Sequence, residues 1–170
     1  MDALAGPYLA SAALLVVAGG AKVVDPLPLM RALMSVGVRA PRRLVQVAAV
    51  AEAVLGLAAI ATGSRIAAAG VALSYAAFTG FVLVALRRGG VLASCGCFGK
   101  ADTPPTAGHV VVTAVLAAVA AGVAARPIGP LPDLLAASPW SGVPLLLATA
   151  AVGVTAYLVL ALLPTLRVRT

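Results

Sequence analysis

Five long apolar runs occupy most of the chain, and they constrain it to helices that cross a membrane. The runs cover residues 3–24, 44–62, 66–86, 110–125 and 143–163, of which the fourth is the shortest. A helix needs about 20 mainly apolar residues to cross a hydrocarbon core about 30 Å thick. We therefore predict an all-α polytopic membrane protein with five transmembrane helices.

Composition excludes other broad classes of protein. Hydrophobic residues make up 62% of the chain and charged residues only 10%, whereas about a quarter of the residues in a typical soluble domain are charged. Few residues remain for a separate globular domain. The net charge of +7 does not indicate nucleic-acid binding, because the basic residues lie in the gaps between apolar runs. Asp2 and the lack of Lys or Arg before the first run argue against a cleavable signal peptide.

The connecting segments indicate how the helices are joined. Residues 63–65 (Gly-Ser-Arg) should form a tight turn, so that the second and third runs make an antiparallel hairpin. In the loop 87–108, Pro104-Pro105 should prevent a helix from beginning before His109. Residues 126–142 hold several prolines and Trp140, which predicts an interfacial connector.

Positive charge is distributed unevenly between the two ends of these helices. Five spans place the loop after the first run, the loop 87–108 and the C-terminus on one side. That side carries ten of the twelve Lys and Arg residues, and the other side carries only Arg65 and Arg126. Because cytoplasmic loops are enriched in Lys and Arg, we predict that the N-terminus is outside and that the cysteine-containing loop and the C-terminus are cytoplasmic.

The only two cysteines, Cys95 and Cys97, lie in that loop on either side of Gly96. A disulfide between them would close a small, strained ring, and labile disulfides of this kind serve catalysis or regulation. Neighbouring basic groups favour the reactive thiolate; here they are Arg87, Arg88 and Lys100. The alternative is a pair of inert loop thiols or a passive clip.

Glu52 lies eight residues into the second run, about 12 Å along the helix axis and close to the bilayer midplane. An acidic residue there costs on the order of 3 kcal/mol and normally faces a partner inside the bundle. Lys22 is the expected partner, and the pair either fixes helix register or handles protons. Small residues dominate both faces: Ala48, Ala49, Gly56 and Ala59 beside Glu52, and Ser11, Leu15, Ala18 and Gly19 beside Lys22.

Two further polar positions are candidates for supporting roles. His109 opens the fourth run, where it is either an interfacial or capping residue or, if it lies near Cys97, a proton shuttle. Tyr75 and Thr79 share a face of the third run, and they either line a ligand cavity or bond to another helix; we favour the second reading. The supporting polar residues are therefore Lys22, Glu52, His109 and Tyr75.

Three motifs occur in the order of a known family. They are Ala-Lys-Val-Val-Asp-Pro at 21–26, Ala-Glu-Ala-Val-Leu-Gly-Leu at 51–57 and Cys-Gly-Cys-Phe-Gly at 95–99. Together they resemble the MauE family of methylamine utilisation proteins, within the wider DoxX-like four-helix membrane group. The resemblance implies a four-helix membrane domain over residues 3–125, followed by the Pro-rich connector 126–142 and an additional transmembrane helix at 143–163.

The resemblance also implies a role. It suggests a bacterial plasma (inner) membrane protein that works with a thioredoxin-like partner, with Cys95 and Cys97 as the redox pair and Lys22 and Glu52 as intramembrane polar residues. In the methylamine system this partnership is associated with disulfides of the small subunit of methylamine dehydrogenase, a substrate that does not transfer to every member. Disulfide formation belongs outside the cytoplasm, whereas the charge distribution places this loop inside.

Three functional hypotheses follow. In the first, Cys95 and Cys97 exchange electrons with a thioredoxin-fold protein, for disulfide handling or maturation of a partner enzyme. Turnover then needs an external acceptor, either a second protein or a quinone between helices near Glu52 and Tyr75, which no sequence motif supports. In the second, the cysteines and His109 bind or transport a soft metal such as Cu, Zn or Hg. In the third, the chain is a non-catalytic membrane assembly factor.

Overall fold

The computed structural model describes residues 3–87 and 106–162, and most of these residues are helical. Within those residues there is no β-strand. Five helices are long and apolar enough to cross a membrane, which confirms the predicted all-α polytopic architecture. They are α1 (Ala5–Val24), α3 (Arg42–Thr62), α4 (Arg65–Arg87), α5 (Ala107–Ala125) and α7 (Val143–Tyr157), the last continued by a π-helical turn, η2 (Leu158–Leu162).

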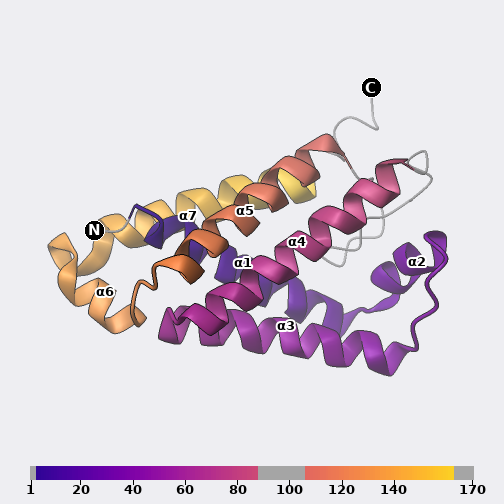
Figure 1. The fold of residues 1–170 in the computed structure, drawn as a ribbon, viewed down its shortest axis with the longest axis horizontal. Coiled ribbons are helices and arrows are strands. Elements are labelled where there is room, and N and C mark those ends of the chain that lie inside the picture. Colours follow the sequence, from indigo (N-terminus) through magenta and orange to yellow (C-terminus); the bar gives the residue numbers. More distant parts are fainter. Residues whose placement is uncertain (1–2, 88–105, 163–170) are drawn as a thin grey trace.

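Helix α1 lies at the centre of the bundle (Figure 1). It packs against α3, α7, α5 and α4, and over half of its apolar window is buried, compared with about a quarter or less in the other spans. The second close pair is α4 with α5. Most of the surface of the other four spans therefore lies on the outside of the bundle, whereas α1 is largely shielded by its neighbours.

Successive spans run in opposite directions, so the helix ends gather at the two ends of the bundle (Figure 1). One end of the bundle, hereafter the basic end, holds the C-terminal ends of α1 and α4 and the beginnings of α3 and α5. The opposite end holds the turn between α3 and α4, where Gly63 adopts the left-handed conformation (φ +55°) that glycine tolerates best. There Arg65 Nη2 donates to the Ala125 carbonyl over 3.4 Å, which joins the hairpin to the end of α5.

Helix α5 begins earlier than the sequence predicts. We expected Pro104-Pro105 to hold back the helix until His109, but it starts at Ala107. Thr106 and His109 form a capping box: the Thr106 side chain accepts from the His109 backbone N–H, and the imidazole accepts from the Thr106 N–H. These bonds satisfy two helix-terminal donors, so two more residues become helical.

Two short helices lie in segments predicted as connectors. These are α2 (Leu27–Ser35) at the basic end and α6 (Leu131–Ala137) at the opposite end, where the 3₁₀ turn η1 (Pro139–Gly142) follows. In both α2 and α6 a proline occupies the first turn, where a missing N–H breaks no helical hydrogen bond. Prolines in these two segments therefore lie at the beginnings of short helices. Trp140 is 83% exposed, as expected for an interfacial residue.

Candidate functional site

An ion pair joins α1 to α3 inside the described part of the bundle. Lys22 Nζ lies 2.6 Å from Glu52 Oε2, and the side chains are 2% and 19% exposed respectively. Charged groups at this depth are costly and need a partner. The pairing predicted from the sequence is therefore present, and the carboxylate is its more accessible member.

Helix geometry explains why two residues so differently placed along their helices meet. Side chains lean toward the N-terminus of their own helix. Because α1 and α3 run antiparallel, Lys22 leans back from the basic end while Glu52 leans toward it. The Lys22 ammonium and the Glu52 carboxylate therefore approach each other along the bundle axis and meet between the positions of their two Cα atoms.

Two glycines let the backbones of α1 and α3 come close enough for this contact. A Cβ atom on Gly19 would lie 2.7 Å from the Ala49 carbonyl oxygen and 2.8 Å from the Ala53 nitrogen. A Cβ atom on Gly56 would lie 2.7 Å from the Ala12 carbonyl oxygen. All three distances are shorter than a real Cβ atom keeps from its neighbours, so any side chain at either position would force the two backbones apart.

The buried faces of the two helices follow the predicted strips with one exception. The strip on α1 is buried throughout: Ser11, Leu15, Ala18 and Gly19. On α3, Ala49, Gly56 and Ala59 are buried as expected, but Ala48 is exposed and Val45 is buried instead. The crossing with α1 turns the packed face of α3 toward Val45, which a helical wheel drawn without a partner cannot show.

A third helix completes the surroundings of Lys22. Its Nζ lies 4.2 Å from the centroid of the Phe78 ring on α4, a cation–π contact. Phe78 in turn meets Tyr75 edge-to-face, with ring centroids 6.2 Å apart. Among the described residues the Glu52 carboxylate is the one hydrogen-bond acceptor of the ammonium, so the ring supplies a second source of stabilisation for this buried charge. Three helices therefore meet at one charge.

Tyr75 and Thr79 bond to other helices, in agreement with the reading we favoured. The Tyr75 hydroxyl donates to the Ser11 carbonyl over 2.8 Å, joining α4 to α1. Thr79 Oγ1 donates to Thr113 Oγ1 over 2.8 Å, joining α4 to α5. Thr113 Oγ1 then donates to the His109 carbonyl over 2.7 Å. Phe78 and Thr79 are adjacent, so the ion pair and this chain of hydrogen bonds both contact the same turn of α4.

His109 is 1% exposed at the start of α5 and serves as a capping residue. Its Nδ1 accepts from the Thr106 N–H over 3.3 Å, which leaves the ring proton on Nε2. In the part of the chain that the structure describes, Nε2 has no hydrogen-bond partner. The capping role is therefore present, whereas the role as a proton shuttle remains a prediction.

The predicted redox residues Cys95 and Cys97 lie outside the described residues, as do Arg88 and Lys100. Arg87 is described: it ends α4 at the basic end and is exposed, a position that also suits a cation at a helix C-terminus. Over residues 3–87 and 106–162, no three His, Cys, Asp or Glu side chains gather in a way that could hold a metal ion.

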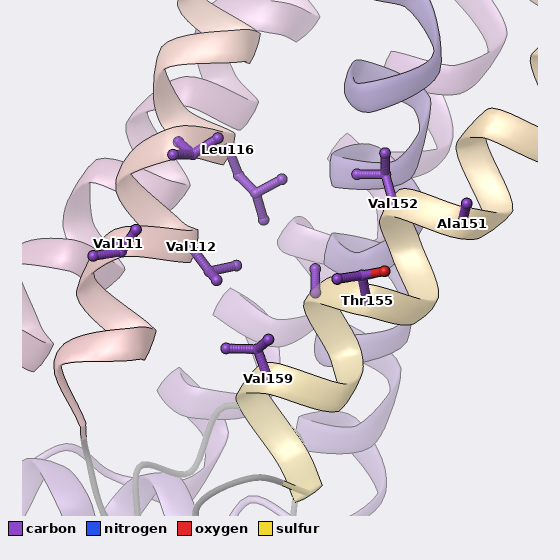
Figure 2. Close-up of a pocket in the computed structure, with 9 residues that line it drawn as sticks. Val111, Val112, Leu116, Ala151, Val152, Thr155 and Val159 are labelled. Carbon is purple, nitrogen blue, oxygen red and sulfur yellow. The ribbon is translucent and has the colours of Figure 1, made fainter.

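Two cavities bear on the predicted quinone. The one beside Tyr75, bounded also by Phe78 and Thr113, has a volume of about 20 Å³, room for about one water molecule. A quinone ring does not fit there. A larger groove of about 360 Å³ lies between α5 and α7 (Figure 2). Its lining is apolar except for Thr155 and includes neither Glu52 nor Tyr75.

Sequence reasoning missed Phe78 and Thr113. Phe78 is one of only three phenylalanines in the chain, and it lies one turn from Tyr75 on α4. Because aromatic residues are scarce in this chain, its place beside Tyr75 could have identified it as a candidate. Thr113 is the one polar residue in the apolar run 110–125, and in lipid such a hydroxyl usually bonds to its own backbone or to a neighbouring helix. The structure brings both to the turn of α4 that faces Lys22.

A family model described as methylamine utilisation protein MauE matches residues 3–126, which include every residue of the ion pair and of the polar chain. No curated protein matches the chain, and no solved structure matches it. The family match covers more than two thirds of the sequence and leaves out α6, η1 and α7. This multi-pass membrane protein therefore belongs to the MauE family.

Proposed function

We propose that this chain is the membrane component of a thiol–disulfide exchange system, with Cys95 and Cys97 as its redox pair and a thioredoxin-fold protein as its partner. The observation that carries the proposal is the Cys-Gly-Cys sequence, which holds the only cysteines of a chain that belongs to the MauE family. It connects α4 to α5, whose adjoining ends both lie at the basic end of the bundle.

The proposed reaction transfers two electrons and two protons. A thiolate of the reduced partner attacks one sulfur of the Cys95–Cys97 disulfide, which forms a mixed disulfide and releases the other cysteine as a thiolate. The partner's second thiolate then resolves the mixed disulfide. The partner ends oxidised, and Cys95 and Cys97 end as a dithiol. A second protein that reoxidises the dithiol completes turnover.

Within this proposal the Lys22–Glu52 pair handles protons. Glu52 is the partly exposed member and Lys22 is enclosed by Glu52 and Phe78. A proton that reaches Glu52 neutralises it while the ammonium keeps its contact with the ring. The family description names methylamine utilisation, and we assign this exchange to the maturation of a partner enzyme.

Capture of a thioredoxin-fold bait tests the exchange. A reduced bait without its resolving cysteine should form a mixed disulfide with the wild-type chain. Cys95→Ser and Cys97→Ser should each abolish capture, because neither variant can form the disulfide that the bait attacks. Ser94→Ala is the matched control and should be captured like the wild type. Undiminished capture in both cysteine variants would contradict the proposal, and full complementation by the double variant would favour a non-catalytic assembly role.

Orientation is a separate expectation. The distribution of Lys and Arg favours a cytoplasmic position for the cysteines and the basic end. A membrane-impermeant maleimide should then label Cys95 and Cys97 only after the cells are opened. Labelling of intact cells after mild reduction alone would instead place a reducible disulfide outside, reverse the predicted orientation and favour disulfide formation over a reducing relay.

A further inference from the structure

Four arginines lie exposed at the basic end, where α2 leads into α3. We call this group the basic surface: Arg31, Arg39, Arg42 and Arg43. Within residues 3–87 and 106–162 the sole ion pair is that of Lys22 with Glu52, and none of the four guanidinium groups has a hydrogen-bond partner there. Asp25, the acid nearest to Arg31 in sequence, accepts the Leu27 N–H over 3.1 Å, and Glu52, the acid nearest to the other three, is paired with Lys22. The four positive charges therefore face outward without neutralisation by described residues.

Helix α2 combines this charge with exposed apolar side chains. Leu27, Arg31 and Met34 follow at i, i+4 and i+7, so they share one face. Leu27 is 48% exposed and Met34 is 55% exposed. On the other side, Ala32 is buried against Ala85 of α4, which fixes α2 to the bundle. An outward face with two apolar residues around one arginine suits the boundary between hydrocarbon and headgroups, where the arginine extends its charge toward the phosphates.

We propose that the basic surface and the outer face of α2 bind anionic phospholipid headgroups. Charge complementarity carries the argument: unpaired guanidinium groups present donors in a fork that matches phosphate oxygens. The exposed Leu27 and Met34 favour lipid over an acidic protein surface, because they lie beside helices that already cross the bilayer. The inference does not depend on the proposed thiol chemistry and should hold in a chain that lacks both cysteines.

The opposite end of the bundle provides the matched control. It carries Arg65 and Arg126, and the short helix at that end, α6, holds the acidic Asp133 and no basic residue. The Arg65 guanidinium already donates to the Ala125 carbonyl. A general attraction of arginine for anionic lipid would involve both ends. Specific binding by the basic surface would involve only the basic end.

Lipid retention by the purified full chain tests the proposal. We would titrate the protein in neutral detergent with phosphatidylglycerol or phosphatidylcholine of identical acyl chains and count bound lipids by native mass spectrometry. The wild type should prefer phosphatidylglycerol, and the variant Arg31→Gln/Arg39→Gln/Arg42→Gln/Arg43→Gln should lose affinity by about fivefold for each arginine that contacts lipid. Arg65→Gln/Arg126→Gln should match the wild type. The four arginine-to-lysine changes should keep the preference for phosphatidylglycerol but bind it less tightly, because lysine keeps the charge and loses the fork.

Other outcomes would overturn the proposal. If the wild type binds both lipids equally, the arginines serve another partner, such as an acidic protein face. If Arg65→Gln/Arg126→Gln lowers the affinity as much as the four changes at the basic end, the basic surface is not a specific lipid site. If circular dichroism shows that the fourfold variant does not fold, Arg39→Gln/Arg43→Gln replaces it. We then expect the loss of affinity for phosphatidylglycerol that corresponds to two arginines instead of four.

A second measurement tests the position of α2 directly. Trp140 is the only tryptophan, so Met34→Trp in a Trp140→Phe background reports on α2 alone. In vesicles with 20 mol% phosphatidylglycerol, lipids brominated near the headgroup should quench its fluorescence, whereas an aqueous quencher should act weakly. Quenching by the aqueous reagent only would place this face in water and contradict the proposal.

Discussion

Replacing either member of the Lys22–Glu52 pair with methionine should lower the free energy of unfolding by about 3 to 5 kcal/mol, because each change leaves one charge buried without its partner. The double variant Lys22→Met/Glu52→Met should recover most of that loss, since two apolar side chains of similar volume remove both charges together. Unfolding in a denaturing detergent, followed by circular dichroism, measures all three variants. The difference between the double variant and the sum of the singles gives the coupling energy.

The control for this cycle is Asp25→Asn, which changes an acid at the exposed end of α1 that takes part in no ion pair of the described structure. It should change stability by less than about 1 kcal/mol. A double variant that is less stable than either single one would contradict the coupling. The same double variant separates the two roles considered for the pair: if it is stable but inactive in disulfide exchange, the charges handle protons, and if it is stable and active, they only fix helix register.

Adding a single methyl group to Gly19 or Gly56 should separate α1 from α3. Gly19→Ala and Gly56→Ala would each place a Cβ atom within 2.8 Å of backbone atoms of the facing helix. Backbone cannot move aside as a side chain does, so each change should cost about 1 to 3 kcal/mol. Thermal unfolding in detergent measures the loss, and a double-mutant cycle with Glu52→Gln should show that the ion pair weakens at the same time.

Gly20 offers a closely matched control, because it lies next to Gly19 on the same helix but has no heavy atom within 4 Å of its built Cβ position. Gly20→Ala should be neutral or slightly stabilising, since alanine is favoured over glycine in a helix interior by up to about 1 kcal/mol. If Gly20→Ala were as destabilising as Gly19→Ala, helix propensity or insertion rather than close approach would explain both effects.

Sequence patterns were sufficient for the features that depend on local composition and on lipid as solvent. The five spans follow from the length of each apolar run, and their ends fall within a few residues of the predicted ones. The Lys22–Glu52 pair was also predictable, because an ionisable group in hydrocarbon needs a partner and few candidates existed. The preference for interhelical bonds at Tyr75 and Thr79 rests on the same requirement.

Tertiary structure decided what depends on which helices are neighbours. The position of Phe78 over the Lys22 ammonium, the bond from Thr79 to Thr113 and the exposure of Ala48 all follow from how α3, α4 and α5 pack around α1. A sequence pattern gives the angular position of a residue on its own helix but not the crossing of that helix with another. The sequence by itself therefore determined the membrane architecture and the pairing of charges, whereas packing around α1 decided which side chains meet that pair.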